Sequence, residues 1–238
     1  MTNRRSSAAL RAIQRIVSGV LASVLATSAL AADSGYLPNT SLNLVNYFRS
    51  ASGLYVDLDV GAAQYPNTID VGAPDIVLKS VDSRTVDTAW GLAFGWRFTA
   101  YFATEVGYVN LGRESVTLSD GSAANHAAGS ATLAIQGPTI AFTGSIPFDA
   151  WESYLKVGYL FSNAGLSFSG TIGPGPLGGD FSKESPAPFA ALGVLYKFDE
   201  RWYAKLELER YQNVAYDSSN TTNTVNVNAG TAGIGFRF

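Results

Sequence analysis

The stretch Ala89-Trp-Gly-Leu-Ala-Phe-Gly-Trp-Arg-Phe98 decides the fold class of this chain. Large apolar side chains occupy every second position, and the positions between them hold alanine, glycine or arginine. This period of two is that of a β-strand, in which successive side chains point to opposite faces. A soluble sandwich would bury the large face against a second sheet, whereas a barrel in lipid turns that face outward and packs small and polar groups inside.

The same alternation recurs from about residue 53 to the end of the chain. Six further segments carry large apolar residues on one parity and small or charged residues on the other: 54–61, 102–108, 155–161, 192–197, 202–209 and 231–238. An eighth and less regular segment runs roughly from Ala131 to Ile146. Its apolar parity slips near Gly137-Pro138, where we expect a β-bulge, because proline cannot donate to a ladder.

The connections between these segments alternate in length. Three are tight turns, at Thr99-Ala100, Pro147–Ala150 and Asp199-Glu200, and aromatic residues crowd beside them, as an interfacial girdle requires. We expect long polar loops over 64–84, 112–130, 169–186 and 212–224. Short turns on one side and long loops on the other are typical of outer-membrane barrels. The sequence therefore predicts an all-β fold, an eight-stranded antiparallel up-and-down transmembrane β-barrel over residues 51–238.

The N-terminus has the pattern of a secretory signal. Four arginines precede an apolar stretch from Ile16 to Leu30, and Ala29-Leu-Ala31 supplies the cleavage pattern. A transmembrane anchor is the alternative, but the apolar run is short and is diluted by serine, glycine and threonine. We expect residues 1–31 to be a cleaved signal peptide, residues 32–50 a lead-in segment, and the barrel to lie in the outer membrane. Losing four arginines and no acids makes the product more acidic than the full chain, whose net charge is −3, which argues against nucleic acid as a partner.

The chain ends in Gly233-Ile-Gly-Phe-Arg-Phe238, which resembles the signature by which outer-membrane proteins are handed to the barrel-assembly machinery. Phe236 and Phe238 would carry that assembly signal. Together with Glu105-Val-Gly-Tyr-Val-Asn-Leu111, Leu155-Lys-Val-Gly-Tyr159 and Lys205-Leu-Glu-Leu-Glu209, this ending makes the chain resemble the OmpA-like outer-membrane β-barrel superfamily, of the eight-stranded surface-antigen type. The resemblance implies outer-membrane lipid, lipopolysaccharide and the assembly machinery as partners. Unlike in OmpA proper, we expect no peptidoglycan-binding domain after the barrel.

No segment predicts catalytic, cofactor or metal chemistry. Gly173-Pro-Gly-Pro-Leu-Gly178 matches a phosphate-loop pattern, but its prolines remove the donors and no helix follows. His126, the only histidine, has no serine or acid beside it, although the resemblance includes barrel enzymes that use such a pair. The chain has no cysteine, and Asp70, Asp75 and Asp82 lack the spacing of a Ca²⁺ loop. We therefore expect no enzyme activity and no cofactor.

The inward parity carries as many bases as acids. The acids are Asp57, Asp59, Glu105, Glu207 and Glu209, and the bases are Arg97, Lys156, Lys197, Lys205 and Arg237. An eight-stranded barrel is only wide enough for side chains to fill it, so buried charges must pair. We predict a salt-bridged layer of Glu105, Lys156, Lys205 and Glu207, with Asp57 at its edge. The alternative for the bases near the ends, Arg97, Lys197 and Arg237, is that they snorkel out of the lumen.

These observations favour a structural or surface-exposed barrel with a largely plugged lumen, whose long loops form the contact surface for a ligand that the sequence does not name. A narrow passive pore for water, ions or small solutes is the first alternative. A lipid-modifying enzyme that depends on His126 is the second.

Overall fold

The computed structural model describes residues 53–66, 80–119, 127–172, 175–218 and 221–238. Nine strands lie in these ranges: β1 Gly53–Gln64, β2 Ser80–Arg84, β3 Val86–Arg97, β4 Phe102–Ser119, β5 Ala127–Phe148, β6 Trp151–Ile172, β7 Gly175–Lys197, β8 Trp202–Ser218 and β9 Thr221–Arg237. Within the same ranges, no helix has the length and apolar character needed to cross a membrane. The predicted signal peptide, lead-in segment and His126 lie outside the described residues.

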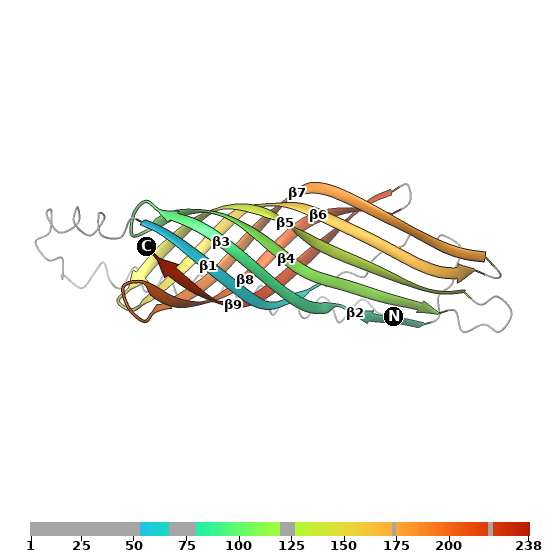
Figure 1. Cartoon of the computed structure of the whole chain (residues 1–238), viewed down its shortest axis with the longest axis horizontal. Helices are drawn as coiled ribbons and strands as arrows, with labels where there is room; N and C mark the ends of the chain where they lie inside the picture. The colour runs from blue at the N-terminus through green and yellow to red at the C-terminus, as the bar shows by residue number, and fades with distance from the viewer. Residues whose placement is uncertain (1–52, 67–79, 120–126, 173–174, 219–220) are drawn as a thin grey trace, which may run out of the picture. The chain divides into compact units, whose positions relative to one another are not determined.

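The strands close into a ring of antiparallel neighbours (Figure 1). Strands β3 to β9 pair in sequence order, and β1 closes the ring between β3 and β9. The short β2 pairs with β4 above β3, from which it is separated by Thr85 alone, so the two occupy one position in the wall. The predicted eight-stranded up-and-down barrel is therefore confirmed.

The outer face of the wall carries an apolar band. Large side chains such as Trp96, Leu206 and Phe94 are 57%, 59% and 56% exposed. Exposing this much apolar surface is unfavourable in water but not in lipid. On β4 to β9 the band ends at the first outward polar residue on the long-loop side. The upper polar ring is formed by these residues: Asn110, Gln136, Asn163, Glu184, Arg210 and Asn228. On β6, Trp151–Phe161 fill the band, which is the length that a tilted strand needs to cross a bilayer.

The prediction of long loops is wrong for most of their residues that the structure describes, because the strands continue above the upper polar ring. Strands β6 and β7 pair from Trp151↔Tyr196 to Ile172↔Gly175, and β4 pairs with β5 as far as Ser119↔Ala128. Above the ring the outer face meets water, so serine, threonine and aspartate replace the large outward apolar residues. The apolar residues there point inward instead, and the ladder persists. The described part of the glycine-rich stretch, 175–178, is strand in β7, which removes the helix that a phosphate site would need.

The predicted bulge at Gly137-Pro138 is also wrong. Odd-numbered residues of β5 face the lumen from Ala131 to Ser145 without a break, and the β5–β6 ladder merely omits two pairs. The register shift lies in β4, between Asn110 and Arg113. There Gly112 has a φ of 74°, which favours glycine, and donates its N–H to the Asn110 Oδ1 at 2.8 Å.

Closure predicts resistance to SDS at room temperature. No edge of the ring is left unpaired within the apolar band, and detergent keeps the outward side chains covered. We expect the unheated protein to migrate faster on a gel than the same sample after boiling. Identical mobility before and after boiling would contradict a closed barrel.

The C-terminal residue predicts a second effect, on assembly. Phe238 is 76% exposed, and it is held by a hydrogen bond from its N–H to the Leu54 carbonyl oxygen at 3.0 Å. Deleting it should cost roughly 1 kcal/mol of folded stability, yet lower the amount of outer-membrane protein in cells sharply. Quantitative immunoblots of outer-membrane fractions measure this, with Phe198→Ala as a control at another exposed phenylalanine, beside a short turn. Equal levels for the deletion and the control would exclude an assembly role.

Candidate functional site

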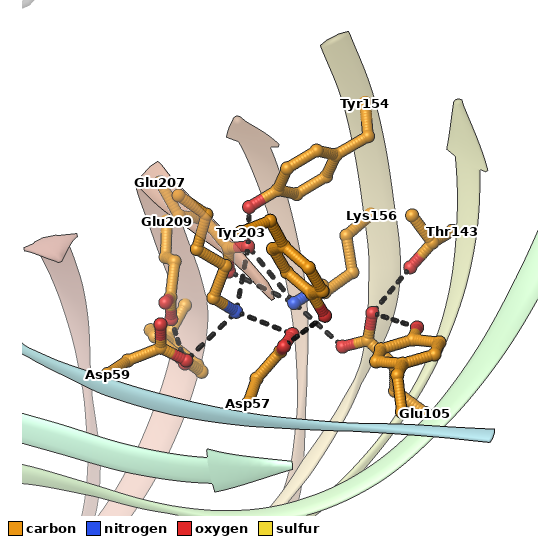
Figure 2. Close-up of polar contacts among 12 residues, drawn as sticks. Asp57, Asp59, Glu105, Thr143, Tyr154, Lys156, Tyr203, Glu207 and Glu209 are labelled. Carbon is orange, nitrogen blue, oxygen red and sulfur yellow. Dashed lines mark hydrogen bonds and ion pairs between the residues drawn. The ribbon is translucent and has the colours of Figure 1, made fainter. Parts of the chain in front are cut away.

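The candidate site is the interior of the barrel, where charged side chains from opposite walls meet within the apolar band (Figure 2). Lys156 of β6 stands between two acids. Its Nζ lies 2.8 Å from Glu105 Oε2 on β4 and 3.0 Å from Glu207 Oε2 on β8. The side chains of the three residues are between 3% and 8% exposed. Three strands are thus joined across the lumen by one lysine.

Lys205 of β8 makes the second half of this middle layer. Its Nζ lies 3.0 Å from Asp57 Oδ2 and 2.9 Å from Asp59 Oδ2, both on β1, and 4.0 Å from Glu207 Oε2. The middle layer therefore consists of Asp57, Asp59, Glu105, Lys156, Lys205 and Glu207. Asp57, expected at its edge, is a direct partner of a lysine.

Three tyrosines complete the hydrogen bonding of these acids. Tyr55 donates to Glu105 Oε1 at 2.7 Å, Tyr154 donates to Glu207 Oε2 at 2.5 Å, and Tyr203 donates to Asp57. Thr143 also donates to Glu105 Oε1, at 3.1 Å. The carboxylates of Asp57, Glu105 and Glu207 are thus each held by a cation and by at least one hydroxyl, as a buried charge requires, whereas among the described residues Asp59 is held by Lys205 alone.

Each of these tyrosines lies over a glycine directly across the ladder. The pairs are Tyr55↔Gly95, Tyr154↔Gly193 and Tyr203↔Gly235. A Cβ atom at these glycines would come within 2.0, 2.2 and 2.0 Å of the ring atoms. The glycines therefore provide the space that lets a bulky ring turn along the inner wall and reach an acid.

A second cluster, the lower layer, lies at the short-turn end of the lumen. Glu152 of β6 is 1% exposed and meets three bases: Arg97 at 2.5 Å, Arg237 at 3.4 Å and Lys197 at 3.5 Å. These are the bases for which snorkelling was the alternative. Glu152 is not among the residues predicted from the sequence, although its inward parity beside Tyr154 and Lys156 indicates this position.

The two layers are complementary in charge. In the middle layer and the adjacent Glu209, five acids face two lysines, whereas in the lower layer three bases face one acid. The excess of acids in one layer is therefore nearly balanced by the excess of bases in the other. Cavities of about 20 Å³ between the layers and about 50 Å³ above the middle layer are each large enough for a few water molecules at most.

The lumen changes character above the middle layer. A cluster of fully buried apolar residues fills it, including Leu111, Leu133, Ile135, Leu166 and Val227. Glu114, placed inside by the β4 bulge, is 0% exposed, and neither of its carboxylate oxygens has a hydrogen-bond partner among the described residues. Glu114 falls within the polar loop predicted over 112–130, and its inward position follows only from the bulge.

The described residues contain no group of three or more histidine, cysteine, aspartate or glutamate side chains arranged to hold a metal ion. The lumen is therefore a set of ion pairs and tyrosine hydrogen bonds, covered by an apolar cluster.

The isolation of Glu114 predicts that its replacement stabilises the protein. A buried polar group without a partner costs about 1–3 kcal/mol, so Glu114→Leu should raise the free energy of unfolding by about that amount. Urea titration of the refolded barrel in detergent measures it, with the outward, exposed Glu184→Leu as control. A lower unfolding midpoint for Glu114→Leu than for the wild type would show that Glu114 has a stabilising partner.

A family model described as the OmpA-like transmembrane domain matches residues 49–238. Solved structures with a similar fold include Neisserial surface protein A (15% identity, TM-score 0.43, 79% of this chain and 98% of that chain) and OprG from Pseudomonas aeruginosa (16%, 0.46, 79% and 97%). Ail of Yersinia pestis is 12% identical, with a TM-score of 0.43 over 78% of this chain and 99% of that chain. No match was found among curated proteins. The family match covers most of the chain, which therefore belongs to the OmpA-like transmembrane domain family and is an outer-membrane β-barrel protein.

Proposed function

We propose that this protein is a structural, surface-exposed barrel with a closed lumen, whose extracellular hairpins form its contact surface. The observation that carries the proposal is the middle layer, in which Lys156 and Lys205 join β1, β4 and β8 through buried ion pairs. An ion that crosses the lumen has to separate these pairs. Each separation leaves a buried charge without its partner, which is strongly unfavourable.

The upper lumen supports the same proposal. Above the middle layer a permeating ion meets apolar side chains, which offer no ligand in place of its water. Outside, the hairpins extend past the upper polar ring, with β6 and β7 continuing to Ile172 and Gly175. Their outward serine, threonine and aspartate side chains suit contact with water-soluble partners.

A narrow pore is the second candidate, and the two polar cavities favour it. They lie on either side of the middle layer, and both are lined by Glu105 and Lys156. A rotation of the Lys156 side chain would join them. Water or a small ion could then pass the middle layer, provided that the apolar cluster above it also opened.

Conductance in planar bilayers separates the two candidates. For the closed barrel, we expect the refolded wild type to conduct little at neutral pH. A steady open-channel current carried by single wild-type barrels would contradict the closed lumen and favour the pore.

Removing Lys156 should open the middle layer. Lys156→Ala leaves Glu105 and Glu207 buried without their shared cation, so we expect a loss of roughly 3–5 kcal/mol in unfolding free energy, or brief channel openings absent from the wild type. Lys183→Ala is the matched control, because the Lys183–Asp217 pair lies outside the lumen layers at 3.3 Å with side chains 35% and 31% exposed. The control should change neither quantity appreciably. If Lys156→Ala behaves like the control, the middle layer does not hold the lumen closed.

A further inference from the structure

A groove of about 440 Å³ lies on the outer surface of the barrel, across β4, β5, β6 and β7. Its outward-facing lining comes from all four strands: Tyr108, Gln136, Pro138, Phe161, Asn163, Glu184 and Pro186. None of these side chains belongs to the lumen, so the groove is independent of the proposed function.

Two prolines shape the groove. Pro138 and Pro186 lie on either side of β6, and their compact rings are flanked by the larger side chains of Tyr108 and Phe161. Pro138 and its neighbour Gly137 fall where the β5–β6 ladder omits two pairs. On the other side of β6, towards β7, the buried Ser162 hydroxyl adds a hydrogen bond by donating to the Ser185 carbonyl oxygen at 2.8 Å. The depression is thus built into the wall.

The groove straddles the upper boundary of the apolar band. Tyr108 and Phe161 are the last outward apolar residues of β4 and β6, and they are 38% and 51% exposed. Gln136, Asn163 and Glu184, directly above, belong to the upper polar ring. An occupant must therefore be apolar below and polar above. The lipid-facing surface continues into the groove without interruption.

The polar side of the groove offers donors and an acceptor. The Gln136 side-chain oxygen accepts from Asn110 Nδ2 at 3.1 Å, and the Asn163 side-chain oxygen accepts from Ser182 Oγ at 3.3 Å. Within the described ranges the NH₂ groups of both amides have no protein partner and are left to donate. The Glu184 carboxylate can accept from a hydroxyl. Acyl carbonyls and sugar hydroxyls at the junction of a head group and its chains match this arrangement.

We propose that this groove binds the acylated amino sugar of an outer-leaflet glycolipid of the lipid A type. The long-hairpin end of an outer-membrane barrel faces the cell exterior, so the groove opens to the leaflet in which such a lipid resides. One acyl chain lies along Pro138 and Pro186, and the sugar meets the amides of Gln136 and Asn163. Glu184 accepts a sugar hydroxyl but repels a phosphate, which orients the phosphorylated positions away from it.

Native mass spectrometry of the folded full chain, titrated with purified lipid A, tests the proposal. Gln136→Ala with Asn163→Ala should weaken binding of the first lipid A molecule roughly tenfold, in keeping with two lost hydrogen bonds. Pro186→Trp, which fills the groove with a large aromatic side chain of the kind that suits the membrane boundary, should produce a similar loss. The matched control is Gln212→Ala with Asn228→Ala, which removes two outward polar groups at a similar height on β8 and β9 and should leave binding unchanged.

Phosphatidylethanolamine, titrated in parallel, distinguishes the glycolipid from general coating by lipid. We expect it to bind more weakly and to respond equally to the groove and control variants. Comparable affinity of the wild type for both lipids, or a loss that is equal for the groove and control variants, would overturn the proposal. Gel mobility before and after boiling identifies folded variants. If the double alanine variant does not fold, Pro186→Trp decides the outcome.

Discussion

Backbone hydrogen bonding in lipid is the constraint on which the rest of this structure depends. A peptide group without a partner in the bilayer core is strongly unfavourable, so the strands must close on themselves. With eight positions in the wall, closure leaves a lumen only as wide as its side chains. Inward-facing side chains are then favourable only if they are apolar or if their charges are paired. The number of strands therefore accounts for the ion pairs of Lys156 and Lys205.

The same narrowness explains why tyrosine and glycine occur together on the inner wall. An acid and a lysine on opposite walls can meet in the lumen only if the inner face of the wall beside them leaves room for their side chains. Gly95, Gly193 and Gly235 leave this room because they have no side chain. The tyrosine opposite each glycine lies in the space and donates a hydrogen bond to an acid. The tyrosines are therefore part of the charge pairing, since each removes an unsatisfied lone pair that would otherwise oppose burial.

The sequence predicts the fold well because lipid imposes a strong pattern on it. Between the short turns and the upper polar ring, large residues must point out, so alternation identifies the strands and the inward charges, including Glu105, Lys156 and Glu207. Above the ring that requirement ends and the outward positions become polar. The pattern of large outward residues that identifies the strands below the ring is therefore absent from the hairpins that continue above it. The bulge at Gly112 defeats the same reasoning, because a one-residue shift in register moves Glu114 to the opposite face.

The surroundings of the barrel change at the upper polar ring, and the polarity of the wall reverses with them. Below the ring lipid lies outside, so the outer face is apolar and charges are held inside. Above it water lies outside, so polar side chains turn outward and the interior is filled by residues such as Leu133 and Leu166. One closed sheet thus behaves as a membrane protein at one end and as a soluble β-barrel at the other. Glu114 points inward, as charged residues do below the ring, but it lies above the ring among apolar side chains. It is therefore the one acid described there that is fully buried and has no partner.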